Sequence, residues 1–393
     1  MLIGLRGAAT ECLGGEPQTR QKSRETPGSA GESLNPKRGC MTAGVLAFFI
    51  ALVASLTLTI PVRALALRVG MVDLPGTRKV HVQPIPLLGG LAMYGGVMLG
   101  ILFAFDGAAR TQSAGIVTGA TLVAVVGFLD DRGWLHHQIK LFVGMPVAAG
   151  ILLASGIHAR VFEMFVQGRW GYLLDAALTI FWVVGITASF SIFDHMDGLC
   201  AGVAAVASFF FALLAYLNGQ RVVTTLAAAV LGAAAGFLRW NFKPAKIFMG
   251  DGGAMLLGFL MATLGLKLRL EQANQLSAWL APLLILAVAI FDTTLVIISR
   301  SRRGLLPFAT PGKDHAAHRL ANAGLGQRGA VLTLYFVGTL GGGAAILVSY
   351  LSTRGALAAG IAALVLAMLA IAMLERAPYE RQTRKGTAPV PEG

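Results

Sequence analysis

The sequence contains few charged residues and few cysteines. Only 13% of its 393 residues are Asp, Glu, Lys or Arg, whereas a soluble protein carries about 25%. A soluble chain of this length could not cover its apolar residues with so few charges. The three cysteines lack the spacing of a metal or redox motif, so neither a disulfide framework nor a zinc site is indicated. An ordinary soluble domain is therefore excluded.

Acidic residues are especially scarce. The chain has 19 Asp and Glu against 32 Lys and Arg, a formal net charge of +13. Such a balance is typical of proteins that bind nucleic acid, an anionic membrane surface or an anionic substrate. The basic residues are dispersed among loops between apolar runs rather than gathered on one face, which excludes nucleic acid as the partner.

What the sequence does contain is a series of uncharged runs, most of them close to the 20 or so residues that a membrane helix needs. The runs are rich in Ala, Gly, Leu and Val, and small residues let helices pack closely in lipid. We therefore predict an all-α polytopic integral membrane protein with about eleven transmembrane helices. The runs are Met41–Val62, Val82–Phe105, Thr111–Leu129, Leu141–Ala159, Ala176–Phe193, Gly198–Gln220, Val222–Leu238, Gly252–Leu266, Gln272–Phe291, Gly329–Thr353 and Gly355–Leu374.

Lys and Arg are unevenly divided between the two sets of connections. The segments after odd-numbered runs, with the C-terminal tail, hold 19 of them, and those after even-numbered runs hold seven. Because basic loops stay inside, the first set is predicted to be cytoplasmic. Residues 1–40 have no apolar run and no signal peptide, so we expect a disordered extension, and a start at Met41 stays open. Residues 41–375 form the predicted membrane domain, and residues 376–393 a basic cytoplasmic tail.

Acidic and histidine residues collect at the ends of the runs, on the predicted cytoplasmic side. Taken singly, each group has an ordinary explanation as a helix cap, a surface loop or a topology determinant. Five groups on one face and none on the other are improbable as independent accidents. The groups are Asp73 with Arg78, Lys79 and His81; Asp130 and Asp131 with His136, His137 and Lys140; Asp194, His195 and Asp197; Lys243, Lys246 and Asp251; and Asp292 with Asp314, His315, His318 and Arg319.

This mixture of side chains indicates phosphate chemistry. Mg²⁺ usually binds through one or two carboxylates together with substrate phosphates. Lys, Arg and His hold phosphate charge, and glycines at a helix N-terminus let backbone N–H groups approach phosphate oxygens. The pattern therefore predicts phosphoryl transfer at the cytoplasmic membrane surface, where metal ions and fixed cations stabilise the transferred group.

Five strings resemble, in order, the polyprenyl-phosphate N-acetylhexosamine-1-phosphate transferases of glycosyltransferase family 4, and most closely the undecaprenyl-phosphate N-acetylglucosamine-1-phosphate transferase branch. The resemblance runs from about Asp73 to Arg319. The strings are "DLPGTRKVHVQPIPLLGG", "GFLDDR" followed by Lys140, "DHMDGL", "FMGDGG" and "DHAAHRL".

The resemblance implies that undecaprenyl phosphate or a similar lipid attacks the β-phosphorus of a UDP-N-acetylhexosamine. The products are polyprenyl-diphosphate-sugar and UMP, in the first step of cell-envelope glycan synthesis such as that of lipopolysaccharide. It also implies a requirement for Mg²⁺, with Mn²⁺ as a substitute, and a multi-pass protein of the bacterial inner membrane whose active site faces the cytoplasm. A homodimer is a further expectation.

The resemblance also implies roles for individual residues. Whether Asp130 acts as a base or handles metal and diphosphate stays open, because a phosphate already ionised near neutral pH hardly needs a base. The implied catalytic residues are Asp130, Asp131 and Lys140, the implied metal ligands are Asp251 and Asp131, and the implied substrate-binding residues are Asp194, Asp197, Gly250, His315, His318, Arg319, Lys79 and His81.

The chain also departs from the family pattern. Ala188 and Ser191 stand where asparagines are common, and His195 where a glycine is common. Ala317 stands where the histidine loop, residues 313–320 of this chain, has its middle histidine. The metal aspartates are intact, so activity is expected. Three alternatives stay open: a phospho-MurNAc-pentapeptide transferase, disfavoured because a run of three histidines is missing; a secondary transporter, with Asp175 and Asp292 nearest the membrane interior; and a non-catalytic membrane scaffold.

Overall fold

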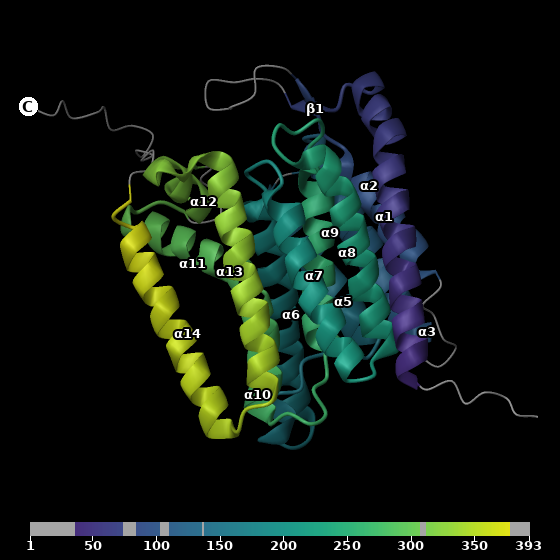
Figure 1. The fold of residues 1–393 in the computed structure, drawn as a ribbon. Coiled ribbons are helices and arrows are strands. Elements are labelled where there is room, and N and C mark those ends of the chain that lie inside the picture. The colour runs from purple at the N-terminus through teal and green to yellow at the C-terminus, as the bar shows by residue number, and fades with distance from the viewer. Residues whose placement is uncertain (1–35, 74–83, 103–109, 136, 307–311, 378–393) are drawn as a thin grey trace, which may run out of the picture. The chain divides into compact units, whose positions relative to one another are not determined.

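The computed structural model of the protein describes residues 36–73, 84–102, 110–135, 137–306 and 312–377, which form one compact unit (Figure 1). These residues are almost entirely helical, which confirms the predicted all-α class. Lys79, His81 and His136 lie outside the described residues. The helices are α1 (Pro36–Arg68), α2 (Gly89–Ile101), α3 (Arg110–Asp131), α4 (His137–Ile139), η2 (Lys140–Gly144), α5 (Met145–Ala154), η3 (Phe162–Met164), α6 (Arg169–Phe193), α7 (Leu199–Leu217), α8 (Arg221–Asn241), α9 (Gly250–Lys267), α10 (Gln275–Ile285), α11 (Ala287–Arg302), α12 (Ala316–Leu320), η4 (Ala321–Leu325), α13 (Gly326–Ser349) and α14 (Thr353–Leu374), and the strands are β1 (Val72–Asp73) and β2 (Ile85–Pro86).

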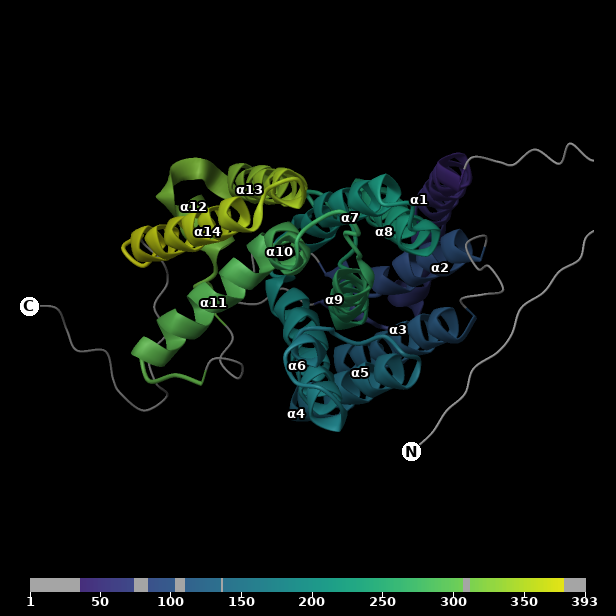
Figure 2. The same ribbon diagram turned by 90° about the horizontal axis from the view of Figure 1, so that it is seen from below.

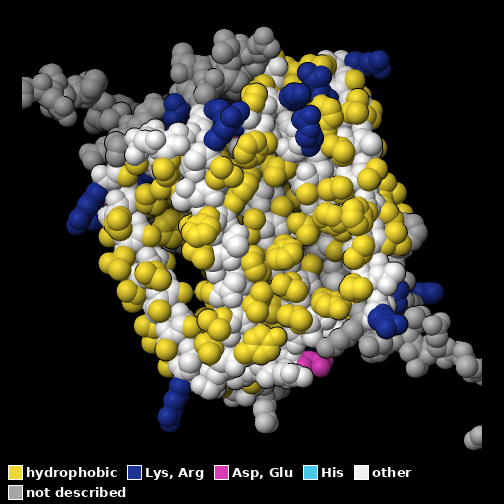
Figure 3. Space-filling model, viewed as in Figure 1, with side chains coloured by type: hydrophobic (Ala, Val, Ile, Leu, Met, Phe, Trp, Pro, Cys, Tyr) yellow, Lys and Arg dark blue, Asp and Glu magenta, His cyan; other side chains and the backbone are white. Residues whose placement is uncertain are grey.

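Within the described residues, seven helices are long and apolar enough to cross a membrane, or eight if the bent pair α10 and α11 is one span. Two shorter apolar helices, Gly89–Ile101 and Lys140–Ala154, accompany them. Each predicted run overlaps a helix or a pair of helices, but a count of eleven spans is not confirmed. Figure 3 shows a broad band of hydrophobic side chains with Lys and Arg toward its two ends, as expected of a multi-pass membrane protein.

Two predicted boundaries differ from the structure. Helix α1 begins at Pro36, so the last five residues of the expected extension are helical. The expected run Gln272–Phe291 is not one helix, because α10 and α11 meet at an angle of 71°. Pro282 lacks the N–H that would bond within α10 and weakens the helix just before this break. Helix α11 then continues to Arg302, which places Asp292 inside a helix rather than at the end of one.

Helix α9 is the centre of the bundle, and nearly all of its residues are buried. Figure 2, which looks along the bundle, shows α9 surrounded by α2, α3, α5, α6, α7 and α8. Close backbone contacts fix its first turn. A Cβ atom on Gly90 of α2 would lie 2.3 Å from the backbone N of Gly253, and one on Gly127 of α3 would lie 2.5 Å from the Cα of Gly252. Only glycine permits this approach, so α2 and α3 position the start of α9.

A small sheet holds the segment before α9 at the same end of the bundle. Strands β1 and β2 pair antiparallel, with Val72 opposite Pro86 and Asp73 opposite Ile85. Leu87 then pairs with Phe248 in the connection between α8 and α9. This arrangement brings residues from β1, β2 and the α8–α9 connection to one place, where the polar side chains also gather.

Candidate active site

A pocket of about 590 Å³ is lined by residues from β1, β2, the α6–α7 turn, the α8–α9 connection and α12. Strand β1 and helix α12 lie at the same end of the bundle (Figure 1). Five carboxylates line the pocket, together with two lysines and two histidines, so it collects residues from every predicted polar group with described members. The polar residues of its lining are Asp73, Asp131, Ser191, Asp194, His195, Asp197, Asn241, Lys243, Asp251, Lys313, His318 and Gln327, and Gly250 also lines it.

Asp131 joins α3 to the start of α9. Its carboxylate accepts hydrogen bonds from the backbone N–H groups of Asp251, at 2.8 Å, and Gly252, at 3.1 Å. It therefore caps the N-terminus of α9, where a negative charge is stabilised by the helix dipole. Gly250 makes this contact feasible, because its φ of +72° suits glycine and an added Cβ would lie 2.4 Å from Asp131 Oδ2. Asp131 and Gly250 together thus fix the position of the backbone at the start of α9.

Lys140 lies between two carboxylates. Its Nζ donates at 2.6 Å to Asp130 Oδ2 and at 2.6 Å to Asp251 Oδ2. The hydroxyl of Ser191 donates to the other Asp251 oxygen at 2.6 Å. The three predicted residues Asp130, Lys140 and Asp251 are thus brought together, and Ser191, at a position where the family often has asparagine, serves as a hydrogen-bond donor to Asp251.

The turn between α6 and α7 contributes two further carboxylates. Asp197 Oδ2 accepts the backbone N–H of Ala245, at 3.1 Å, and Asn241 accepts the N–H of Gly198 and donates to the carbonyl of Ile247. These bonds join the turn to the α8–α9 connection. Burial, followed by the charges of Asp251, Asp131 and Asp197, raises the pKa of Asp194 well above its usual value. The pocket therefore concentrates negative charge that a cation would relieve.

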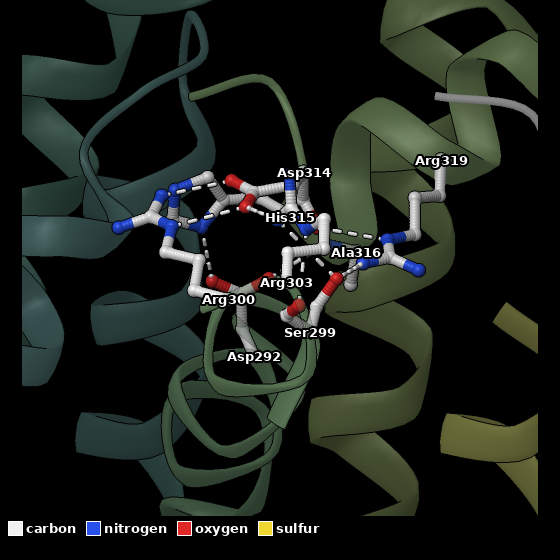
Figure 4. Close-up of polar contacts among 8 residues, drawn as sticks. All are labelled: Asp292, Ser299, Arg300, Arg303, Asp314, His315, Ala316 and Arg319. Atoms are coloured by element: carbon white, nitrogen blue, oxygen red, sulfur yellow. Dashed lines mark hydrogen bonds and ion pairs between the residues drawn. The ribbon is translucent and has the colours of Figure 1, made fainter. Parts of the chain in front are cut away.

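The histidine loop is anchored by ion pairs that Figure 4 shows. Arg300 binds Asp314 through two hydrogen bonds, of 3.0 and 2.8 Å, and Arg303 adds a third. Burial alone would raise the pKa of Asp314, but the hydrogen bond and charge of Arg300, with the bond from Arg303, lower it to about 2. Asp292 accepts from His315 Nδ1 and from the backbone N–H of Ala316, both at 2.7 Å. Helix α11 thus holds the start of α12.

The loop residues predicted to bind substrate do not all reach the pocket. His318 lines it, whereas His315 and Arg319 are absent from its lining and almost fully buried. Arg319 donates to the Asp314 carbonyl and Ser299, and also to the Leu374 carbonyl and Glu375 at the end of α14. In this structure His315 and Arg319 therefore support the wall behind His318 rather than line the pocket.

The oxygen-rich lining fits a hard divalent cation such as Mg²⁺. Asp251, Asp194 and Asp197 lie in one pocket, where burial raises the pKa of Asp194 and the neighbouring carboxylates add to this effect. Both oxygens of Asp131 already accept backbone N–H groups, although a carboxylate has further lone pairs. Among the described residues, the one set of three potential ligand atoms within 4.8 Å of one another is His195, Asp292 and His315. Its nitrogen-rich character does not suit Mg²⁺.

Sequence reasoning did not single out several pocket residues. Asp73, Lys243 and His195 belong to the polar groups of the sequence, which assign them no role, and no sequence pattern marks Asn241 or Lys313. Asn241 follows the last apolar turn of α8 and precedes a Lys-Pro pair, a combination that marks a helix end but does not reveal its two bonds to other segments.

The two acidic residues nearest the membrane interior have local partners. Asp175 accepts three backbone N–H groups, from Val161, Phe162 and Glu163, and so anchors the connection between α5 and α6. Asp292 anchors α12 in the same way. Both carboxylates therefore have structural roles, and neither lies in the lining of the pocket. The sequence features that suggested a transporter are thereby accounted for.

Several known proteins are similar in sequence to this chain. The model of glycosyl transferase family 4 matches residues 113–269. A probable undecaprenyl-phosphate N-acetylglucosaminyl 1-phosphate transferase of Bacillus subtilis is 37% identical over 75% of this chain and 82% of its own length. A decaprenyl-phosphate N-acetylglucosaminephosphotransferase of Mycolicibacterium smegmatis is 34% identical over 81% and 85%. An undecaprenyl-phosphate alpha-N-acetylglucosaminyl 1-phosphate transferase of Yersinia pestis is 28% identical over 71% and 77%. The chain therefore belongs to glycosyl transferase family 4, among the polyprenyl-phosphate N-acetylhexosamine-1-phosphate transferases.

Proposed function

We propose that this protein transfers N-acetylglucosamine 1-phosphate from UDP-N-acetylglucosamine to a polyprenyl phosphate and releases UMP. The observation that carries the proposal is the pocket, where five carboxylates meet lysine and histidine side chains at one end of a membrane helix bundle. The names of the relatives support the lipid acceptor and the sugar. Neither the pentapeptide transferase nor the transporter has support from them.

In the proposed reaction an oxygen of the lipid phosphate forms a bond to the β-phosphorus of the donor. The bond from that phosphorus to the bridging oxygen breaks, and the electron pair leaves with UMP. The lipid phosphate is already ionised, so no residue needs to remove a proton. Asp130 and Asp131 are therefore assigned positioning roles, Asp130 toward Lys140 and Asp131 toward α9. Lys243 and Lys313, which line the pocket, offset the negative charge of the phosphates.

We further propose that Mg²⁺ binds Asp251, with Asp194 and Asp197 as neighbouring oxygen donors. A bound magnesium ion supplies positive charge that stabilises the transferring phosphoryl group. Asp251 is held ready by Ser191 and Lys140, and the ammonium group of Lys140 keeps the carboxylates of Asp130 and Asp251 close together before the substrates bind.

The proposed location is the bacterial inner membrane, with the pocket facing the cytoplasm. The connections that build the pocket follow odd-numbered runs, the set that carries 19 of the 32 Lys and Arg residues. Basic loops are retained on the cytoplasmic side during insertion. This orientation would expose the pocket to a soluble nucleotide sugar while the acceptor lipid approaches from the bilayer.

Release of UMP by purified protein tests the proposal. Protein in detergent should release UMP from UDP-N-acetylglucosamine only when polyprenyl phosphate and Mg²⁺ are both present. Asp251→Asn should abolish release, whereas Glu271→Gln, an exposed carboxylate outside the pocket lining, should leave it unchanged. Mass spectrometry of the lipid should show the polyprenyl-diphosphate-sugar. Absence of UMP across a panel of UDP-sugars would contradict the transferase, and near-normal release by Asp251→Asn would contradict the assigned ligand.

A further inference from the structure

His195 is a pocket residue whose side chain contacts the histidine loop. It lies between Asp194 and Asp197 in the turn that joins α6 to α7, and it lines the pocket. Its imidazole stacks on His315, with ring centroids 4.0 Å apart and planes at 27°. Its centroid is 4.9 Å from that of His318. The same ring contacts the fully buried Phe193 edge-on, at 5.9 Å and 87°. One ring thus touches both the aspartate turn, which is formed by residues 194–197, and the histidine loop.

The nitrogens of this ring make no well-formed hydrogen bond in the structure. Both Nδ1 and Nε2 of His195 are buried, and neither meets the geometric criteria for a hydrogen bond with another described residue, although the Ile192 backbone lies close enough to act as a weak hydrogen-bond partner. His315 differs, because its Nδ1 is bonded to Asp292. The contacts that His195 makes therefore come from the faces and edges of its ring, and aromatic pairs of this kind stabilise their surroundings without hydrogen bonds.

The neighbours of His195 explain why this contact matters to the pocket. The aspartate turn supplies two carboxylates of the lining, Asp194 and Asp197. The histidine loop supplies His318 and Lys313. Asp292 holds His315 from α11, and His195 covers the face of the same ring, so His315 is fixed from two directions.

We propose that His195 is a positioning residue, which holds the histidine loop against the aspartate turn by stacking and thereby sets the geometry with which His318 and Lys313 meet the donor diphosphate. The proposal rests on the function proposed above.

A stacking role and a hydrogen-bonding role for His195 predict different effects of the same substitutions. His195→Ala removes the ring, and it should raise the KM for the UDP-sugar about three- to tenfold, as loss of an aromatic pair implies, with a smaller change in kcat. His195→Phe keeps a flat ring and removes only the unbonded nitrogens, so it should restore a KM close to that of the wild type. His158→Ala is the matched control, because His158 also makes an edge-on contact, with Tyr172, has an unbonded buried nitrogen, and lies outside the pocket lining.

Hydrogen exchange of the full-length protein in detergent supplies a readout that does not need activity. The amides of residues 314–320 should exchange faster in His195→Ala than in the wild type, and at the wild-type rate in His195→Phe and His158→Ala. Failure of the wild type to release UMP would defeat the proposed function alone, since the exchange rates still test the contact. The proposal is overturned if His195→Phe is as impaired as His195→Ala, because the nitrogens are then needed, or if His195→Ala changes neither KM nor exchange.

Discussion

Asp131 and Asp130 are adjacent in sequence but have different structural roles, and replacing each by asparagine should separate them. Asp131 accepts two backbone N–H groups at the start of α9, Asp251 N at 2.8 Å and Gly252 N at 3.1 Å. Asparagine retains one carbonyl oxygen and turns an NH₂ group toward the other donor. Losing one charge-assisted bond costs about 1.5–3 kcal/mol, and losing the negative charge at the helix start adds about 0.3–1 kcal/mol. Asp131→Asn should therefore cost about 2–4 kcal/mol.

Asp130→Asn should be milder. It loses the bond to Lys140, but it also removes the repulsion between Asp130 and Asp251. Thermal unfolding in detergent measures the difference. At about 2 °C per kcal/mol, the lower end for larger domains, Asp131→Asn should lower the apparent melting temperature by about 4–8 °C. Asp130→Asn should lower it by less than half as much, while UMP release falls in both. Equal losses of stability would refute the capping role of Asp131.

Three further predictions follow from the same contacts. Gly250→Ala combines a φ of +72° with a Cβ 2.4 Å from Asp131 Oδ2, so its cost in folding stability should exceed the roughly 1–2 kcal/mol of a left-handed residue. Gly185→Ala in α6 is the control, because a Cβ there meets nothing within 4 Å, and it should be neutral or stabilising in the same melting assay. The pKa of Asp314 is lowered to about 2, so above about pH 4 its ion pairs contribute roughly 2 kcal/mol of folding stability, and this contribution is lost as the pH falls toward 2. The melting temperature of the wild type should therefore fall more steeply over that range than that of Asp314→Asn. Parallel curves would contradict this. Lys140→Gln leaves Asp130 and Asp251 without their shared cation and should lower the rate of UMP release on the order of 10²-fold, with Lys140→Arg retaining more.

The fold class and part of the membership of the pocket could be predicted because both depend on local sequence. Apolar runs reveal membrane helices, and charges placed at their ends reveal a common face. Asp131, Asp194, Asp197, Gly250, Asp251 and His318 accordingly meet in one pocket. The break between α10 and α11 was not predicted, because the hydropathy of the run continues across Leu286 and only the packed structure bends it.

The partners of individual side chains in and around the site could not be predicted, because they depend on contacts between segments that are distant in the sequence. Arg319 has the charge expected of a residue that binds phosphate, yet its guanidinium donates hydrogen bonds to Ser299, 20 residues earlier, and to Glu375, 56 residues later. Asp131 has the charge of a metal ligand, yet its oxygens bind a helix 120 residues away. Residue type thus predicted which polar residues gather near the pocket, and tertiary packing decides which of them are already bonded to other parts of the protein.

The tether between Arg319 and the end of α14 links the pocket to the surrounding lipid. Only 6% of the most apolar stretch of α14 is buried within the protein, so most of this apolar surface is available to acyl chains in a bilayer. Arg319 bonds the last carbonyl of this helix and Glu375, and it bonds the Asp314 carbonyl in the histidine loop. A detergent that replaces the acyl chains along α14 would change the surroundings of a helix that is bonded to the histidine loop through this arginine. The activity of the purified protein should consequently depend on the lipid retained during extraction.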